Sequence, residues 1–130
     1  CQCKAYEKLT ADAEPLWWEP TRKKFYIIDG DMTLCKGVEL LLLPGHTPGS
    51  MGVLVDTEAG KYLIAGDLIQ SNLVFENLVC GLPKPSGVHT HLDQYYESLK
   101  RAMSLGAKIL PAHEMAVLDH PVYPPVGDAE

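Results

Sequence analysis

The chain has 130 residues, of which 46% are hydrophobic and 22% are charged, and it carries a formal net charge of −6. These values are typical of one globular domain with a modest core. They argue against a nucleic-acid partner, because basic residues cluster only at 22–24, and against a membrane protein, because the longest apolar run, 38–43, is interrupted by Glu39.

The start of the chain and its cysteines lead to expectations about its domain, its metal sites and its redox environment. The sequence opens at Cys1, inside an expected strand, so we expect residues 1–130 to form a single partial domain of a longer protein. Cys1 and Cys3 form a C-x-C pair, but no second pair follows at metal-ligand spacing, so a four-cysteine zinc site is not expected. A reduced, cytoplasmic setting fits these cysteines best.

The first part of the chain is predicted to consist mainly of strands. A weakly alternating strand at 1–6 precedes a helix-forming segment at 7–14, which Pro15 ends. Apolar or alternating runs bounded by turn residues predict further strands at 25–28, 32–35, 38–43, 51–55 and 62–65. Of these, 38–43 is almost wholly apolar, which is the pattern of a strand covered on both faces.

The clearest helix is predicted over residues 92–105. Thr90 and Asp93 form a capping pair at its start, and Gly106 fits its C-terminal stop. Its apolar stripe at the helical period comprises Leu92, Tyr95, Tyr96, Leu99, Ala102 and Met103. A short strand at 108–110 follows. Because most strands precede the main helix, the sequence predicts an α+β layered fold.

Three polar residues share one placement, since each comes just after an apolar strand. They are His46, Asp67 and His113, which follow the predicted strands at 38–43, 62–65 and 108–110 in turn. Strand ends that converge on one rim of a sheet can hold a site on rigid elements. Each residue alone is more often a cap or a turn former, but two imidazoles and a carboxylate together are good ligands for zinc or a similar ion.

The letters around these residues resemble those of a known family. The segment 43–50, L-P-G-H-T-P-G-S, looks like the P-G-H-T-P-G loop of the metallo-β-lactamase superfamily. A-G-D at 65–67 resembles its G-D after the next hairpin, and P-A-H-E at 111–114 resembles its last metal-binding His. Order and spacing agree over nearly the whole chain. Within the superfamily, the turn at 29–31 and the ending at 119–124 look most like the N-acyl homoserine lactonase group.

The resemblance implies the C-terminal portion of an αββα sandwich with a binuclear, usually zinc, site. His46 would bind one metal, His113 the other, and Asp67 would bridge them. In this mechanism a hydroxide between the metals attacks the substrate carbonyl, one metal polarises the carbonyl oxygen and the other stabilises the leaving oxygen. The resemblance also implies that Asp67 would be placed to take up the proton of the attacking water, as a catalytic residue.

The superfamily's defining H-x-H-x-D-H motif, which supplies its other metal ligands, normally lies upstream of these segments and is missing here. The segment 89–94, H-T-H-L-D-Q, imitates it, but it falls between the second and third family motifs, and Gln94 takes the place of the last His. Asp93 is already explained as a capping residue. We therefore interpret this segment as the start of a helix.

A second departure concerns the substrate. Lactonases of this group often place a Tyr three residues after the bridging Asp, to hydrogen-bond the lactone carbonyl, whereas this chain has Gln70 there. Gln70 can still donate a hydrogen bond and is our second candidate catalytic residue. Trp17, Trp18 and Phe75 are candidates to line an acyl-chain pocket, although core packing or oligomer contact accounts for them equally well.

These observations leave three functions open. The leading hypothesis is a metal-dependent hydrolase that opens a lactone or a similar ester, and its rival is a thioesterase of the hydroxyacylglutathione hydrolase kind. The third is a catalytically inactive half-fold, since an incomplete ligand set binds metal weakly. Half a sandwich also exposes the inner face of its sheet, so we expect association with a chain carrying the missing half or with a second copy.

Overall fold

The structure, a computed structural model, describes residues 26–120, 122 and 123. Its strands are β1 (Met32–Cys35), β2 (Val38–Leu42), β3 (Met51–Thr57), β4 (Gly60–Ile64) and β5 (Lys108–Leu110). Its helices are α2 (Leu92–Ser104) and the short 3₁₀ helices η2 (Gly66–Leu68), η3 (Asn72–Phe75) and η4 (Met115–Asp119). No helix among the described residues is long and apolar enough to cross a membrane.

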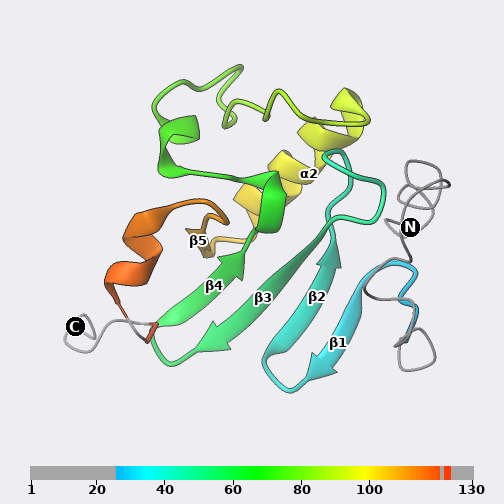
Figure 1. The fold of residues 1–130 in the computed structure, drawn as a ribbon. Coiled ribbons are helices and arrows are strands. Elements are labelled where there is room, and N and C mark those ends of the chain that lie inside the picture. Colours follow the sequence, from blue (N-terminus) through cyan, green and yellow to red (C-terminus); the bar gives the residue numbers. More distant parts are fainter. Residues whose placement is uncertain (1–25, 121, 124–130) are drawn as a thin grey trace, which may run out of the picture.

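The strands form one mixed sheet in the order β1-β2-β3-β4-β5 (Figure 1). The first four pair antiparallel in chain order, whereas β5 pairs parallel with β4 after the chain has passed through α2. Short turns join the hairpins because Gly37 and Gly60 adopt positive φ angles of 80° and 102°, which glycine reaches without strain. In the described part of the chain, one sheet packed with one α-helix confirms the predicted α+β class.

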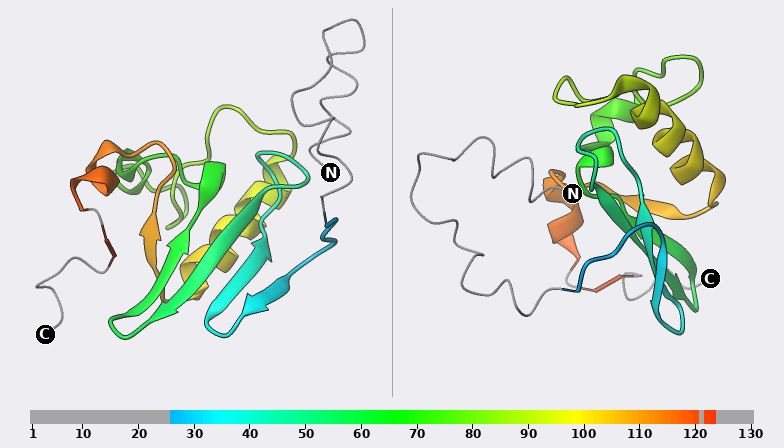
Figure 2. Two further views of the ribbon diagram at one scale, coloured as in Figure 1. Left: turned by 60° about the horizontal axis from the view of Figure 1, so that its bottom comes forward. Right: turned by 90° about the vertical axis from the view of Figure 1, so that its right-hand side faces the viewer.

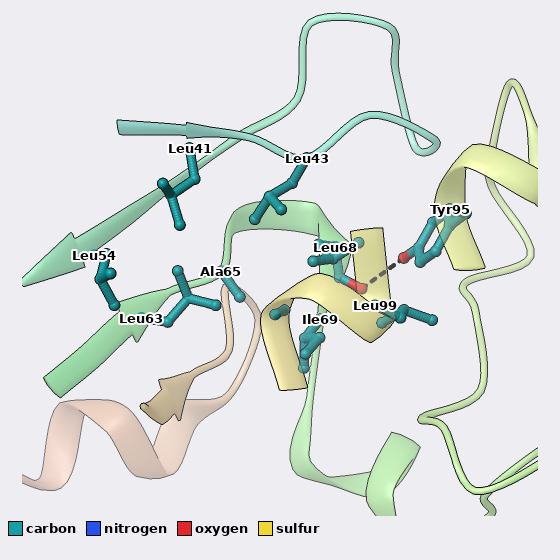
Figure 3. Packing of buried hydrophobic residues seen from close by; sticks show 10 residues of the cluster. Leu41, Leu43, Leu54, Leu63, Ala65, Leu68, Ile69, Tyr95 and Leu99 are labelled. Atoms are coloured by element: carbon teal, nitrogen blue, oxygen red, sulfur yellow. Dashed lines mark hydrogen bonds between the residues drawn. The ribbon is translucent and has the colours of Figure 1, made fainter. Parts of the chain in front are cut away.

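Helix α2 covers one face of the sheet and forms the core with it (Figure 2). The register places Leu54 opposite Leu63, and Leu63 opposite Ile109, so these side chains share the face toward α2. Leu63 of the sheet and Leu99 of the helix belong to one buried cluster, whose side chains Figure 3 shows. Because Leu63 and Leu99 are fully buried, this layer holds the strand ends in fixed positions.

The opposite face of the sheet is also apolar. Leu40 pairs with Val53, and Val53 with Ile64, so these side chains form a row that points away from α2. Ile64 is 47% exposed. Toward the β4 side, the ring of Tyr123 packs against Tyr62 with their centroids 6.0 Å apart. An apolar pattern on both faces is typical of a sheet in the middle of a layered fold.

Some sequence expectations are wrong in detail. Residues 26–28, predicted as a strand, have no regular structure. The N-cap of α2 is His91, whose Nδ1 accepts from the backbone N–H of Gln94, and not Thr90. The predicted stripe is narrower than expected, because Leu92 and Met103 are 45% and 43% exposed. The features predicted at 1–6 and 7–14, together with the proposed pocket role of Trp17 and Trp18, lie outside the described residues.

Candidate metal centre

The three residues predicted as metal ligands meet at one end of the sheet. His46 follows β2, Asp67 lies in η2 directly after β4, and His113 follows β5. Asp67 Oδ1 lies 2.8 Å from His113 Nε2, and Asp67 Oδ2 lies 3.6 Å from His46 Nε2. The carboxylate therefore stands between two imidazoles and presents one oxygen to each of them.

His46 is held by the segment that leads into α2. Its Nδ1 lies 2.7 Å from the carbonyl oxygen of Val88, so the neutral ring carries its proton on Nδ1 and keeps a lone pair on Nε2, which faces Asp67. A backbone carbonyl that fixes the tautomer in this way is the usual second partner of a metal-binding His. The backbone N–H groups of Thr90 and His91 both donate to the Gly45 carbonyl, so the whole loop lies against the helix start.

The turn that carries Asp67 is fixed by hydrogen bonds from two sides. Gly66 begins η2 with a φ of 56°, a left-handed conformation that turns the chain sharply after β4. On one side, the Tyr95 hydroxyl lies 2.9 Å from the Asp67 carbonyl oxygen. On the other, the N–H groups of Ala112 and His113 donate to the carbonyls that follow the turn, at Ile69 and Gln70. The carboxylate thus has a defined main-chain support.

His113 is the most open of the three residues. Its side chain is 63% exposed, compared with 15% for His46 and 40% for Asp67. The next residue, Glu114, accepts from the Asn72 N–H at 2.9 Å and from the Ala116 N–H at 3.4 Å, so it joins the starts of η3 and η4. Sequence reasoning missed this role, because only the cap position of Glu114 ahead of η4 signals it.

The distances between the donor atoms fit zinc on the His46 side of Asp67 but not on the His113 side. Two atoms bound at about 2.1 Å to one tetrahedral zinc ion lie about 3.4 Å apart, so the 3.6 Å between His46 Nε2 and Asp67 Oδ2 matches such a pair. The 2.8 Å between His113 Nε2 and Asp67 Oδ1 is a direct hydrogen bond, which must open to admit an ion. Among the described residues no three His, Cys, Asp or Glu side chains surround one position. His46 and Asp67 therefore fit a half-site of two ligands, and Asp67 and His113 form a second one only after their hydrogen bond has opened.

The other candidate residues have clear positions. Gln70 is half-buried, and its carbonyl accepts from the His113 N–H at 2.7 Å. Phe75 packs against the hydrophobic core, as the packing alternative anticipated. His91 caps α2 and the Nδ1 of His89 lies 2.9 Å from the Ser86 carbonyl oxygen, which agrees with interpreting 89–94 as a helix start. An open pocket of about 330 Å³ borders His113.

Comparison with known proteins identifies the family. Residues 7–113 match the model of the metallo-beta-lactamase superfamily. Over 56 residues the chain is 43% identical to an N-acyl homoserine lactonase of Bacillus sp. and 39% identical to one of Bacillus cereus. Each alignment covers 42% of this chain and 22% of the relative, so the matched segment spans about a fifth of those lactonases.

Solved structures of N-acyl homoserine lactone hydrolases and lactonases are similar in fold to this chain. An N-acyl homoserine lactone hydrolase with N-hexanoyl-L-homoserine bound at its catalytic metal centre is 25% identical with a TM-score of 0.57, over 72% of this chain and 37% of that one. A quorum-quenching N-acyl homoserine lactone hydrolase is 26% identical with a TM-score of 0.58, over 76% and 41%. A dizinc quorum-quenching lactonase, 24% identical with a TM-score of 0.56 over 74% and 33%, shares the fold. The chain belongs to the metallo-β-lactamase superfamily, and its α+β fold is the C-terminal portion of that superfamily's αββα sandwich.

Proposed function

We propose that the protein is a metal-dependent hydrolase that opens a lactone of the N-acyl homoserine lactone type, with zinc as its metal. The observation that carries this proposal is the position of the Asp67 carboxylate between the Nε2 atoms of His46 and His113. The similarity to proteins named as N-acyl homoserine lactonases supports the choice of substrate.

Three side chains of this chain would hold the metals. His46 would ligate one ion and His113 the other, and Asp67 would contribute one oxygen to each once its hydrogen bond to His113 has opened. When bound, two zinc ions at such a site polarise a substrate carbonyl and lower the pKa of a bound water. The Val88 carbonyl leaves the His46 Nε2 lone pair available by keeping the ring proton on Nδ1.

Two residues would take part in the chemistry beside the metal ligands. The Asp67 side chain is 40% exposed, so an attacking water molecule can reach its carboxylate and pass a proton to it. Gln70 lies three residues farther along, and its carbonyl is fixed by the His113 N–H. Its side-chain amide would donate a hydrogen bond to the lactone carbonyl and orient it.

A thioesterase of the hydroxyacylglutathione hydrolase kind is the second candidate. The observation that favours it is the presence of Gln70 where lactonases of this group often have a Tyr. Rates on an N-acyl homoserine lactone and on a hydroxyacyl glutathione thioester, measured side by side with the same preparation, separate the two. A higher specificity constant for the thioester would overturn the lactonase assignment and leave the hydrolase assignment in place.

In the third candidate function, the chain alone is catalytically inactive and functions only when it is assembled with a partner. Its support is the apolar row Leu40, Val53 and Ile64 on the face away from α2, together with the lack of any group of three candidate metal ligands among the described residues. The partner would be a chain that carries the rest of the sandwich, or a second copy. Light scattering tests this: Ile64→Lys should reduce association, whereas Met103→Lys, a similarly exposed change on α2, should not.

The decisive test combines metal content and turnover. Elemental analysis should find close to two zinc ions per chain in the active preparation, and Asp67→Asn should lower lactone turnover by about 100-fold or more, because it removes the shared carboxylate. Asp56→Asn, an exposed carboxylate in β3, is the matched control and should leave turnover unchanged. A full rate in Asp67→Asn would overturn the proposal.

A further inference from the structure

Helix α2 presents a row of donors to the loops of the candidate site. The Tyr95 hydroxyl lies 2.8 Å from the Leu68 carbonyl oxygen and 2.9 Å from that of Asp67. Ser98 Oγ donates to the Pro44 carbonyl at 2.6 Å, and Arg101 Nη1 donates to the Leu42 carbonyl at 3.2 Å. Donors spaced by three residues share one helix face, so a single face of α2 contacts the chain just before His46 and the chain at Asp67.

Tyr95 is the residue in this row that contacts both loops. A Cβ atom added to Gly45 would lie 2.5 Å from the backbone N of Tyr95, so the loop of His46 rests directly on the main chain of Tyr95. The hydroxyl at the other end of the same side chain reaches the turn of Asp67, as Figure 3 shows for its hydrogen bond to Leu68. One rigid ring therefore spans the distance between the two loops.

The hydroxyl is suited to this task because it is fully buried and has hydrogen-bond partners on both sides. One O–H proton is shared between the two carbonyl oxygens, while the Ser86 N–H donates to the hydroxyl oxygen at 3.4 Å. A phenylalanine would fill the same space and lose every one of these directional contacts.

We propose that Tyr95 is a positioning residue for the candidate metal site, because its hydroxyl sets the place of the Asp67 turn relative to the His46 loop. The inference rests on the proposed function, since it treats His46 and Asp67 as ligands. Tyr95 itself touches neither metal nor substrate. Its effect passes through the main chain of Asp67, whose carboxylate must stay within reach of both imidazoles.

The test compares Tyr95→Phe with Tyr96→Phe in the full chain. Tyr96 is half-buried beside it and packs on the same core, so its substitution is the matched control. Amide hydrogen exchange in zinc-free buffer measures the turn directly. In Tyr95→Phe, protection of the Ile69 and His113 amides, which bond within and beside the turn, should fall about tenfold more than protection of Leu63 in the sheet.

Zinc affinity is the second measurement, made by competition with a chelator under conditions in which each variant is folded. The dissociation constant should rise about tenfold in Tyr95→Phe and stay unchanged in Tyr96→Phe. Equal loss of protection in the turn and the sheet, or unchanged zinc affinity, would show that Tyr95 is only a core residue and would overturn the inference.

The two proposals fail in different ways. If the unsubstituted chain binds no zinc, the proposed function fails for this chain, and the exchange comparison in zinc-free buffer still decides the role of Tyr95. If Tyr95→Phe does not fold, the unsubstituted chain decides: the buried Tyr95 hydroxyl proton should exchange slowly enough to be observed by NMR. A proton that exchanges too fast to be observed would contradict the proposed hydrogen bonds and overturn the inference.

Discussion

The two sides of the candidate metal centre differ in how they are held. His46 is 15% exposed, and its loop lies against the start of α2 through the Gly45 carbonyl and the Val88 carbonyl. His113 is 63% exposed, and its support comes mainly from the backbone. Its N–H donates to the Gln70 carbonyl, and the next residue, Glu114, accepts from the Asn72 N–H. The difference teaches that one candidate ligand is preorganised by close packing, while the side chain of the other is less constrained.

The largest expected effect is in the loop of His46, which is the closely packed side of the candidate site. Gly45→Ala should lower the free energy of unfolding by about 3 kcal/mol or more, because the new Cβ would meet the Tyr95 backbone at a φ of 133°. Gly60→Ala is the matched control, since its φ is 102° but nothing lies within 4 Å, and it should cost about 1 kcal/mol. Urea unfolding measures both. Equal costs would mean that the loop does not rest on the helix as described.

On the open side, Glu114→Ala should lower the free energy of unfolding by about 1 kcal/mol, because the N–H groups of Asn72 and Ala116 lose their acceptor. Glu58→Ala, at an exposed turn position, should change it by less than about 0.5 kcal/mol. Thermal or urea unfolding checks the pair. A smaller loss of unfolding free energy for Glu114→Ala than for Glu58→Ala would show that the Glu114 carboxylate does not support the segment of His113.

The comparison itself is tested by removing each imidazole in zinc-free buffer. His46→Ala should lower the free energy of unfolding by about 1 kcal/mol, because a poorly exposed ring and its hydrogen bond to Val88 are lost. His113→Ala should cost about 0.5 kcal/mol or less, because its ring is mostly in solvent. The reverse order in urea unfolding would show that the two sides have been assigned wrongly.

The smallest expected effect concerns the stability of the fold at acidic pH. Arg101 and the Leu42 N–H hydrogen-bond to Asp31 and lower its pKa below the ordinary 3.8. The folded chain therefore holds this proton less tightly than the unfolded chain, so the stabilisation is present above 3.8 and disappears as the pH falls through the lowered pKa.

Asp31→Asn should cost about 0.5 kcal/mol at neutral pH, since the pair is partly exposed, and should lose less stability than the unsubstituted chain on acidification. Unfolding series at several pH values measure this, with Asp56→Asn as the control. A parallel loss in Asp31→Asn and the unsubstituted chain would contradict a stabilising role for the ion pair.

Much of the fold was predictable because its signals are local. The apolar run behind β2 and the turn residues around β3 and β4 depend on neighbouring residues, and the structure has these strands within two residues of their predicted bounds. The predicted start of α2 at Leu92 is confirmed as well. The cap of α2 was not predicted, because Thr90 donates to Gly45 instead, and Gly45 lies 45 residues away.

In the candidate site, too, residues with local sequence signals were predictable and residues with distant partners were not. His46, Asp67 and His113 were recognisable because each follows a strand and sits in a family-like motif, although their role as ligands stays a prediction. Gln70 as a catalytic residue also stays a prediction. The supporting residues Tyr95 and Glu114 carried no comparable signal, because their partners lie 27 to 42 residues away in the sequence.

The sequence by itself determined the family, the main strands, the helix and the positions of the three candidate ligands, because local periodicity and short motifs encode them. Only the tertiary structure decided which residues support those candidate ligands, and that the strand register brings Leu40, Val53 and Ile64 into one row. The physical reason is that hydrogen-bond partners and strand register depend on distances between remote segments, which packing sets and no local pattern records.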